Sequence, residues 1–550
     1  MVSPDNQQWY KASWRINDNP FVGKRSFDFR LDPDKYYNRS LTATRLDRPT
    51  QERSSTMRGI VRRTLTAAAV GGAAAVAQAA PPPPNILLIL ADDVGAEAFG
   101  SYGGGSYQTP NINELARTGL QFNHAYACPL CTPSRVELLT GKYNFRNYES
   151  FSWLSPQETT FTEVLRGGGY TTAIAGKWQL SSPARPRVAA GQPTAPDITA
   201  QIMRDGYGFD HYSLWQLNGM GSRYWDPVLD QDGQRVNPGA DEYGPAVNVQ
   251  YLNTFMKQAV ADKKPFVAYY AMELPHNPWV ATPDGPTDRS RTKSSPDSFA
   301  ANIAYLDKQV GQLVAQLDTL GVRGNTLVIF TSDNGTGGPI TSQTKAGSVQ
   351  GDKGQLTDAG THVPFILNWP GKITAGSTDH LMDFSDIMPT LLEVAGVPPP
   401  AGLTPDGRPL IDAAGKLGQA RQYAYVWYDP KGRPPTPGQW ARDQRYKLYG
   451  DGQFFDMTKP TLEKAADNIT PGTGSPEAEA ARARLQKVLD HYAQEEKARP
   501  SAQPRHGRAS PRFAAPRRHT RRRVRHAKRR TRETPATGKV QSTDRAILAR

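Results

Sequence analysis

Short runs of continuously apolar residues recur through the middle of the chain, and several of them end in a polar turn. They lie at Asn85 to Ala91, Thr171 to Ala175, Phe266 to Met272 and Leu327 to Thr331. A run of this length without alternation is typical of a strand that is buried on both faces of a parallel sheet. The pattern therefore predicts an α/β fold with a large mixed, mostly parallel β-sheet sandwiched by helices.

Helical periodicity separates these predicted strands. Phe161 to Arg166 is amphipathic and stops at three glycines, which favours a short helix. Asp297 to Leu320 predicts a long helix with one apolar face, made of Ile303, Leu306, Val310, Leu313 and Leu317. We expect that face to belong to the core.

The chain changes character after a proline-rich connection at Gly396 to Pro405. Short segments then predict a small C-terminal antiparallel sheet, with strands at Tyr423 to Trp427, Tyr446 to Tyr449 and Phe454 to Asp456. Ala478 to Gln494 predicts a charged amphipathic helix. We therefore expect a large α/β domain at 85–395 and a C-terminal α+β subdomain at 407–497.

Both ends of the chain differ from its body in composition. Residues 57–80 combine a basic start, a short apolar run and an A-Q-A cleavage site, which together indicate a secretory signal peptide. Because signal peptides begin at the N-terminus, we expect Met57 to be the true start and residues 1–56 to be a non-native or disordered extension. The protein is then periplasmic or secreted; a genuine extension with an internal membrane anchor is the alternative.

The net charge of +14 comes from the C-terminal tail. Residues 499–550 hold 17 Lys and Arg residues against two acidic residues, so the rest of the chain is close to neutral. The tail has almost no apolar residues and is predicted to be disordered. It is either a tether that contacts polyanions or a solvated extension, and no specific nucleic acid is expected as a partner.

The strongest candidate for a catalytic motif is a pentapeptide that a second short motif follows. Residues 131–135 are C-T-P-S-R, and L-T-G-K-Y follows at 139–143. This stretch resembles the signature of the type I, formylglycine-dependent sulfatases, an arylsulfatase-like family of the alkaline-phosphatase superfamily. The resemblance covers roughly residues 85–495 and implies an alkaline-phosphatase-like fold and a sulfuric ester hydrolase.

In that family a formylglycine-generating maturation enzyme oxidises the cysteine of the pentapeptide, here Cys131, to an aldehyde. The resemblance implies that one hydroxyl of the aldehyde hydrate attacks the sulfur of a sulfate ester, and that the other then expels the sulfate. Arg135 lies one turn further on if a helix begins at Cys131. Its guanidinium can then hold an oxygen of the nucleophile or of the sulfate.

Cys128 and Cys131 also form a C-x-x-C pair. This spacing suits a redox pair or half of a zinc site. A structural zinc site needs more ligands than the two cysteines that the chain contains, and a thioredoxin-like site requires a short βαβ context. We favour the sulfatase interpretation, with a redox pair or a structural cysteine as alternatives.

Two of the predicted strands end in oxygen-bearing side chains. Asp92-Asp93 follows the strand at 85–91, and Asp333-Asn334 follows the strand at 327–331. Sites of α/β proteins lie at the carboxyl ends of strands, and carboxylate and amide oxygens suit Ca²⁺ or Mg²⁺. The resemblance implies that the cation, Ca²⁺ by family preference, is held by Asp92, Asp93, Asp333, Asn334 and the modified Cys131.

Four further positions correspond to the family's substrate-binding motifs. Lys177, in G-K-W-Q-L, and Lys353, in a glycine-rich loop, match two sulfate-binding lysines. His276, in P-H-N-P, matches a histidine at the leaving oxygen, to which a protonated imidazole can donate. Gln179 replaces a family histidine, and an amide cannot act as a general base. Asp358 stands where the family has glutamate.

The stretch from Ser181 to Asn248 has no clear periodicity and is rich in aromatic residues, including Trp215, Tyr224 and Trp225. It is either an insertion that lines the pocket and stacks its rings on sugars, or ordinary loop packing. The sequence leaves both interpretations open.

These observations predict an exported sulfatase that hydrolyses an aryl or carbohydrate sulfate ester. One alternative is a phosphonate or phosphate ester hydrolase of the same superfamily, because the site would accept another tetrahedral anion. The other is a sulfated-glycan binding protein with impaired turnover, which Gln179 and the basic tail favour.

Overall fold

The computed structural model describes residues 82–181, 198–219, 221–286, 290–429, 438–458 and 463–498. Three expectations lie outside the described residues: the extension at 1–56, the signal peptide at 57–80 and the basic tail at 499–550. Of the helices that the structure describes, none has the length and apolar character needed to cross a membrane.

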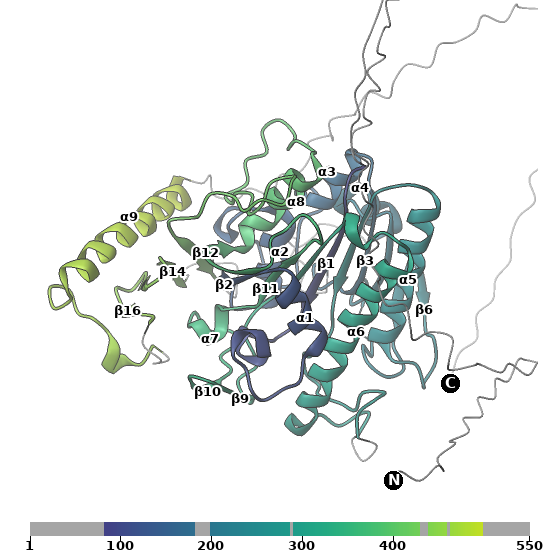
Figure 1. Cartoon of the computed structure of the whole chain (residues 1–550), viewed down its shortest axis with the longest axis horizontal. Helices are drawn as coiled ribbons and strands as arrows, with labels where there is room; N and C mark the ends of the chain where they lie inside the picture. Colours follow the sequence, from purple (N-terminus) through teal and green to yellow (C-terminus); the bar gives the residue numbers. More distant parts are fainter. Residues whose placement is uncertain are drawn as a thin grey trace, which may run out of the picture. The chain divides into compact units, whose positions relative to one another are not determined.

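A ten-stranded sheet forms the centre of the large domain (Figure 1). Its strands are β1 (Asn85–Ala91), β2 (Leu120–Tyr126), β3 (Thr171–Lys177), β4 (His211–Trp215), β5 (Leu229–Gln231), β6 (Gln234–Val236), β7 (Phe266–Ala271), β8 (Thr326–Ser332), β11 (Phe365–Asn368) and β12 (Gly376–Asp383). Their order across the sheet is β12-β2-β11-β8-β1-β7-β3-β4-β5-β6.

The four predicted strands are β1, β3, β7 and β8, and they are neighbours at the centre of this sheet. β1 pairs in parallel with both β7 and β8, and β3 pairs in parallel with β7. All residues of β1, β7 and β8 are buried, as their continuous apolar runs predict. The carboxyl ends of the four strands therefore meet at one edge of the sheet.

Helices cover both faces of the sheet. The α-helices of the described residues are α1 (Pro110–Thr118), α2 (Cys131–Thr140), α3 (Phe161–Gly167), α4 (Ala200–Tyr207), α5 (Gly244–Ala261), α6 (Phe299–Thr319), α7 (Asp358–Thr361), α8 (Ile387–Ala395) and α9 (Pro476–Ala498), of which α9 lies on the C-terminal sheet. Successive side chains of a strand point to opposite faces. Leu88 of β1 accordingly packs in one core with α2, α3 and α8, whereas Leu87 packs in another with α1, α5 and α6.

A separate four-stranded antiparallel sheet follows in the C-terminal part of the chain, with α9 packed on it. Its strands are β13 (Ala424–Tyr428), β14 (Gly438–Arg442), β15 (Tyr446–Tyr449) and β16 (Phe454–Asp456). The predicted fold class is thus confirmed. The strands β2, β4, β5, β6, β11 and β12 of the large sheet were not predicted from the sequence. Nor were β14 and the hairpin of β9 (Thr341–Thr344) and β10 (Gly347–Gln350), which are polar, partly exposed segments without the pattern of a buried strand.

Candidate active site

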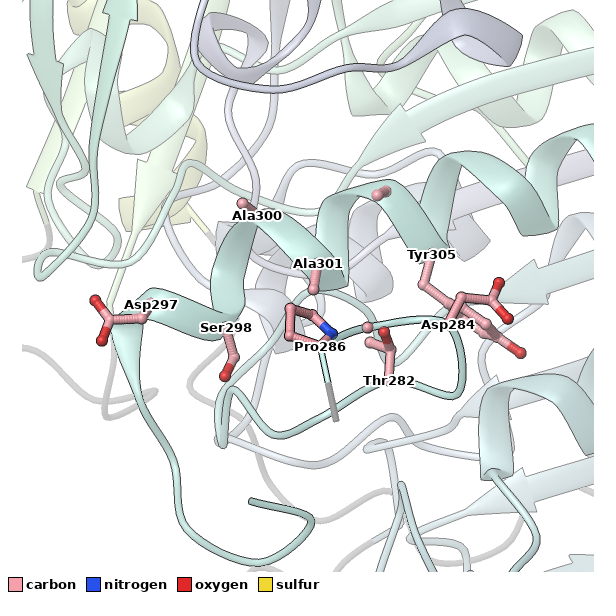
Figure 2. A pocket seen from close by; sticks show the side chains of 10 residues that line it. Thr282, Asp284, Pro286, Asp297, Ser298, Ala300, Ala301 and Tyr305 are labelled. Carbon is pink, nitrogen blue, oxygen red and sulfur yellow. The ribbon is translucent and has the colours of Figure 1, made fainter. Parts of the chain in front are cut away.

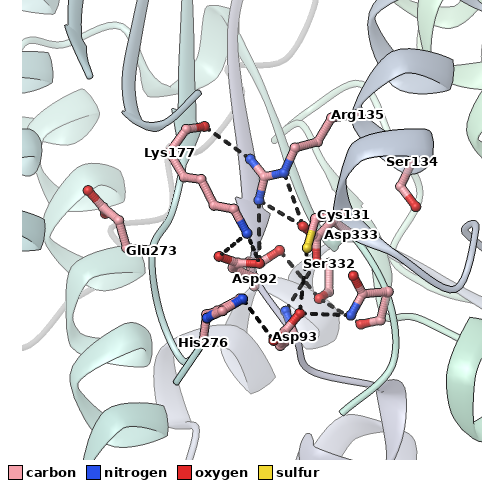
Figure 3. A network of polar contacts seen from close by, with 12 residues as sticks. Asp92, Asp93, Cys131, Ser134, Arg135, Lys177, Glu273, His276, Ser332 and Asp333 are labelled. Carbon is pink, nitrogen blue, oxygen red and sulfur yellow. Dashed lines mark hydrogen bonds and ion pairs between the residues drawn. The ribbon is translucent and has the colours of Figure 1, made fainter. Parts of the chain in front are cut away.

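Most of the predicted site residues come together at the carboxyl edge of the central strands. Figure 3 shows Asp92, Asp93, Cys131, Arg135, Lys177, His276 and Asp333 there. One ligand atom from each of Asp92, Asp93, Cys131 and His276 lies within 4.8 Å of the others. Asp92 and Asp93 follow β1, Asp333 follows β8, and Lys177 ends β3. Parallel pairing of these strands, rather than closeness in sequence, brings the groups together.

Three carboxylates in the site pair with three cations. Lys177 Nζ donates to both carboxylate oxygens of Asp92 at 2.8 Å. Lys353 Nζ donates to Asp93 Oδ2 at 2.6 Å.

The third pair joins Arg135 and Asp333. Arg135 donates to Asp333 Oδ2 through Nη2 at 2.8 Å and through Nε at 3.1 Å. Arg135 Nη2 also lies 3.7 Å from Asp92 Oδ1, so the guanidinium bridges the ends of β1 and β8. Arg135 and Asp333 are both almost completely buried, which makes the pair a fixed part of the site.

The oxygens of the site fit a hard divalent cation. Asn334 Oδ1 is buried and has no hydrogen-bond partner among the described residues, whereas its Nδ2 donates to Asp93 Oδ1 at 2.9 Å. Burial, together with the neighbouring charge of Asp92, raises the pKa of Asp333 to about 7. An unpaired buried acceptor costs free energy unless something binds it, and a group of carboxylates at this density favours a cation.

Cys131 is the first residue of α2, so Arg135 follows one helical turn later, as predicted. Its Sγ lies 3.9 Å from Asp93 Oδ1. Burial raises the pKa of the Cys131 thiol to about 12, although Lys177 and Lys353 act in the opposite direction. The unmodified thiol is therefore protonated at neutral pH and is a poor nucleophile.

Cys128 has a different environment from Cys131, although both thiols are free and buried. Its Sγ accepts a hydrogen bond from Asn144 Nδ2 at 3.2 Å and lies 3.5 Å from Glu137 Oε2. Burial and the charge of Glu137 raise the pKa of Cys128 well above its usual value. Reactive redox pairs need a low-pKa thiolate, so this arrangement argues against the redox alternative.

His276 lies at the open side of the cluster. Its Nε2 lies 3.4 Å from Asp93 Oδ2 and 3.3 Å from Lys353 Nζ. Burial lowers the pKa of His276 to about 4, despite the opposing charges of Asp93 and Asp92. The ring is therefore neutral at neutral pH, and a neutral imidazole keeps one N–H donor.

Gln179 lies two residues beyond the end of β3. It is buried, and its backbone adopts a positive φ of 58°, which is uncommon for a residue other than glycine. Its Oε1 is buried without a hydrogen-bond partner among the described residues. The structure thus leaves a free acceptor at this position, close in sequence to Lys177.

The sequence analysis did not single out Arg223, which lies in the loop between β4 and β5. Its Nη1 lies 3.1 Å from His276 Nδ1, and its guanidinium carbon lies 4.1 Å from the ring centre of Trp215. Trp215 and Tyr224 are buried, and the guanidinium carbon of Arg291 lies 3.8 Å from the ring centre of Trp225. These contacts favour the loop-packing interpretation of the aromatic residues. Only the proximity of Arg223 to the aromatic residues was visible in the sequence.

A surface cavity of about 360 Å³ lies elsewhere, between α6 and the loop at 282–286 (Figure 2). Ala301 and Tyr305 of α6 and Pro286 line it, together with Asp284. None of the predicted site residues is among its lining residues. The cavity has no evident connection to the chemistry.

The comparisons with known proteins agree with this geometry. The family model described as Sulfatase matches residues 84–397. Arylsulfatase A of Homo sapiens is 32% identical over 417 residues, which cover 69% of this chain and 76% of that relative. N-acetylgalactosamine-6-sulfatase of Sus scrofa is 32% identical over 359 residues, 59% of this chain and 65% of that relative.

The fold also matches solved structures. The crystal structure of Ps i-CgsB in complex with k-i-k-neocarrahexaose has a TM-score of 0.60 and 24% identity, covering 75% of this chain and 93% of that one. This likeness agrees with the large mixed, mostly parallel sheet covered by helices. The family model and the two relatives above show that the chain is a hydrolase of sulfuric esters. The chain belongs to the sulfatase family, and it is a sulfatase.

Proposed function

We propose that this sulfatase works through a formylglycine made from Cys131 and a bound divalent cation, Ca²⁺ in preference to Mg²⁺. The convergence of Asp92, Asp93, Cys131 and His276 within 4.8 Å is the observation that carries the proposal. The raised pKa of the Cys131 thiol supports it as well, because the unmodified side chain is poorly suited to attack.

The cation would be held by the oxygens of Asp92, Asp93, Asp333 and Asn334, with the modified residue 131 completing the set. The unpaired oxygen of Asn334 supports this assignment, because a cation gives that buried acceptor a partner. Bound there, a divalent cation screens the charge of the sulfate and acidifies the nucleophilic hydroxyl.

Lys177, Lys353 and Arg135 bind and orient the sulfate in this proposal. All three lie within hydrogen-bonding distance of the carboxylates around Cys131, and fixed cations stabilise charge on a transferring group. A formylglycine hydrate supplies the nucleophilic hydroxyl and a second hydroxyl for sulfate release.

In this proposal His276 and Gln179 act at different steps, His276 when the leaving group departs and Gln179 when the sulfate is released. His276 would offer an Nε2–H to the leaving oxygen in the tautomer whose Nδ1 accepts a hydrogen bond from Arg223. Gln179 offers a free carbonyl oxygen, which accepts a hydrogen bond but does not take a proton. Proton removal during sulfate release then falls to another group or to water.

The substrate is an aryl or carbohydrate sulfate ester, and the protein is exported to the periplasm or secreted. The printed names of the relatives, arylsulfatase A and N-acetylgalactosamine-6-sulfatase, support both classes of ester. The composition of residues 57–80 supports export. A formylglycine-generating maturation enzyme is the partner that the Cys131 pentapeptide requires.

The test uses the full chain produced together with a formylglycine-generating enzyme. Initial rates are measured on 4-nitrophenyl sulfate, sulfated monosaccharides, phosphate diesters and phosphonate monoesters, with added Ca²⁺. We expect sulfate release with multiple turnovers. Faster hydrolysis of phosphonates or phosphate diesters would favour the phosphonate or phosphate ester hydrolase, and sulfated-sugar binding without release would favour the binding protein.

A further inference from the structure

Arg223 is a cation at the margin of the active site that the proposed reaction does not use. It lies between β4 and β5 and faces the side of His276 that points away from the carboxylates. Nδ1 of His276 contacts Arg223, and Nε2 of the same ring contacts Asp93 and Lys353. One imidazole ring thus separates Arg223 from the centre of the site.

The orientation of the Arg223 guanidinium is fixed by aromatic packing. Its carbon lies 4.1 Å from the ring centre of Trp215 and 5.8 Å from that of Tyr224. Trp215 is held in turn by a hydrogen bond of 2.7 Å from its Nε1 to the carbonyl oxygen of Gly221. Tyr224 donates to the carbonyl oxygen of Glu273 at 2.7 Å. A guanidinium that stacks on a ring presents its N–H groups at its edge.

Most of the donors of Arg223 have no protein acceptor. A guanidinium carries five N–H donors. Among the described residues, the Arg223 guanidinium makes one polar contact, with His276. No carboxylate of the described residues forms an ion pair with Arg223, and its side chain is half-buried. The Arg135 guanidinium, by contrast, is almost completely buried and donates to Asp333 and to the carbonyl oxygen of Lys177.

We propose that Arg223 recognises a second oxyanion of the substrate, a carboxylate or a further sulfate beside the sulfate that is cleaved. This inference rests on the proposed function and names its substrate class: a sulfated sugar with an additional negative charge. A stacked, half-buried guanidinium with unused parallel donors is suited to bidentate binding of an oxyanion.

The charges of the site agree with such a substrate. The carboxylates of Asp92, Asp93 and Asp333 balance the three cations Arg135, Lys177 and Lys353. The proposed divalent cation leaves the site with an excess of positive charge, of which a sulfate monoester removes one unit. Arg223 adds a further positive charge at the margin, so a second oxyanion is attracted there and a neutral group is not.

The test compares substrates that differ in one charge. N-acetylglucosamine 6-sulfate is compared with N-sulfoglucosamine 6-sulfate, and a sulfated disaccharide with a uronic acid is compared with its carboxyl-reduced form. The variants are Arg223→Met and Arg223→Lys. Arg291→Met is the matched control, because Arg291 also stacks on a tryptophan but pairs with Asp241.

We expect the wild type to prefer the doubly charged member of at least one pair, which identifies sulfate or carboxylate as the second group. Arg223→Met should reduce that preference about 10- to 100-fold, mainly through KM. Arg223→Lys should retain part of the preference, and Arg291→Met should retain all of it. An equal loss of kcat on every substrate would mean that Arg223 only positions His276, and it would overturn the proposal.

A binding measurement separates this inference from the proposed reaction. Calorimetry of Cys131→Ala, with and without Arg223→Met, gives dissociation constants that do not depend on turnover. Tighter binding of the doubly charged sugar, lost on removal of Arg223, supports the inference even if no sulfate is released. Equal affinity for both members of each pair contradicts it, whatever the activity of the wild type.

Discussion

Two clusters of charged side chains differ in whether their polar groups all have partners within the protein. The first is the active-site cluster, made of Asp92, Asp93, Asp333, Arg135, Lys177 and Lys353. The second, the interface cluster, joins the loop after Lys353 to the C-terminal sheet and consists of Asp358, Arg442, Lys447 and Glu463.

Every charge of the interface cluster has a partner within the cluster. Arg442 Nη1 donates to both oxygens of Asp358 at 3.0 and 3.1 Å, and Lys447 lies 2.8 Å from Glu463. Burial tends to raise the pKa of Asp358, but Arg442 and Lys447 outweigh it and hold the pKa well below its usual range. The ionised form is therefore the stable one.

The active-site cluster also pairs its three carboxylates with three cations, but one of these carboxyl groups has a raised pKa and a buried acceptor beside them has no partner in the described part of the chain. The pKa of Asp333 is raised to about 7, and Asn334 Oδ1 has no partner among the described residues. The comparison indicates that the interface cluster stabilises the fold by itself, whereas the active-site cluster is arranged to receive a cation and an anion. Four experiments test this distinction.

The largest effect is expected from Cys131→Ala. It removes the precursor of the nucleophile but leaves the interface cluster intact, so kcat should fall by at least about 10³-fold while the melting temperature changes little. Cys128→Ala is the matched control, since Cys128 lies outside the active-site cluster; it should keep most of the activity. Comparable losses in both variants would contradict the division of roles between the two cysteines.

Removal of divalent cations should have the next largest effect. A chelator should lower kcat about 10²-fold or more, because screening of the sulfate charge is lost. Ca²⁺ added at about 100 times its dissociation constant should restore activity and stabilise the fold by about 2.7 kcal/mol. The rate and the melting temperature are followed in parallel; a melting temperature that does not respond to Ca²⁺ would refute the assignment of the cation site.

Asp358→Asn should mainly affect stability. It leaves the buried guanidinium of Arg442 without its carboxylate, so urea denaturation should show a loss of about 3 kcal/mol. Because the loop that carries Lys353 is attached here, kcat/KM should fall by less than about tenfold, chiefly through KM. If a folded Asp358→Asn variant lost as much activity as Cys131→Ala, the conclusion that the interface cluster serves stability alone would be wrong.

Acid titration gives the smallest effect. The pKa of Asp358 is lower in the folded protein than its ordinary value of 3.8, so its contribution to stability is present above that value and is lost as pH falls below it. The difference in unfolding free energy between the wild type and Asp358→Asn should be constant from pH 5 to 8 and shrink by about 1 to 2 kcal/mol in stronger acid. If the difference in unfolding free energy between the two proteins instead grew in acid, the ion pair of Asp358 could not be its source.

The buried strands and the residues at their ends could be predicted from sequence because both are local patterns. Asn85–Ala91 is uniformly apolar and Asp92-Asp93 follows it, so the strand and its chemistry are visible together. The register that brings Asp333 beside Asp93 is not local, and the family resemblance supplied that grouping.

Contacts between distant segments could not be predicted in this way. Asp358 was noted only as a departure from the family pattern, and its partner Arg442 lies 84 residues further on, in a strand that the analysis missed. Arg223 has no periodic or motif signal either. Its position depends on the folded loop that stacks it on Trp215 and sets it against His276.

The most direct test of the account is the mass of the tryptic peptide that contains Cys131, from full-length protein made with an active formylglycine-generating enzyme. This peptide spans residues 118–135 and contains both cysteines. We expect the mass of one aldehyde or its hydrate, with fragment ions that place it at residue 131 and leave Cys128 as a thiol. An unmodified Cys131 in that preparation would contradict the proposed nucleophile.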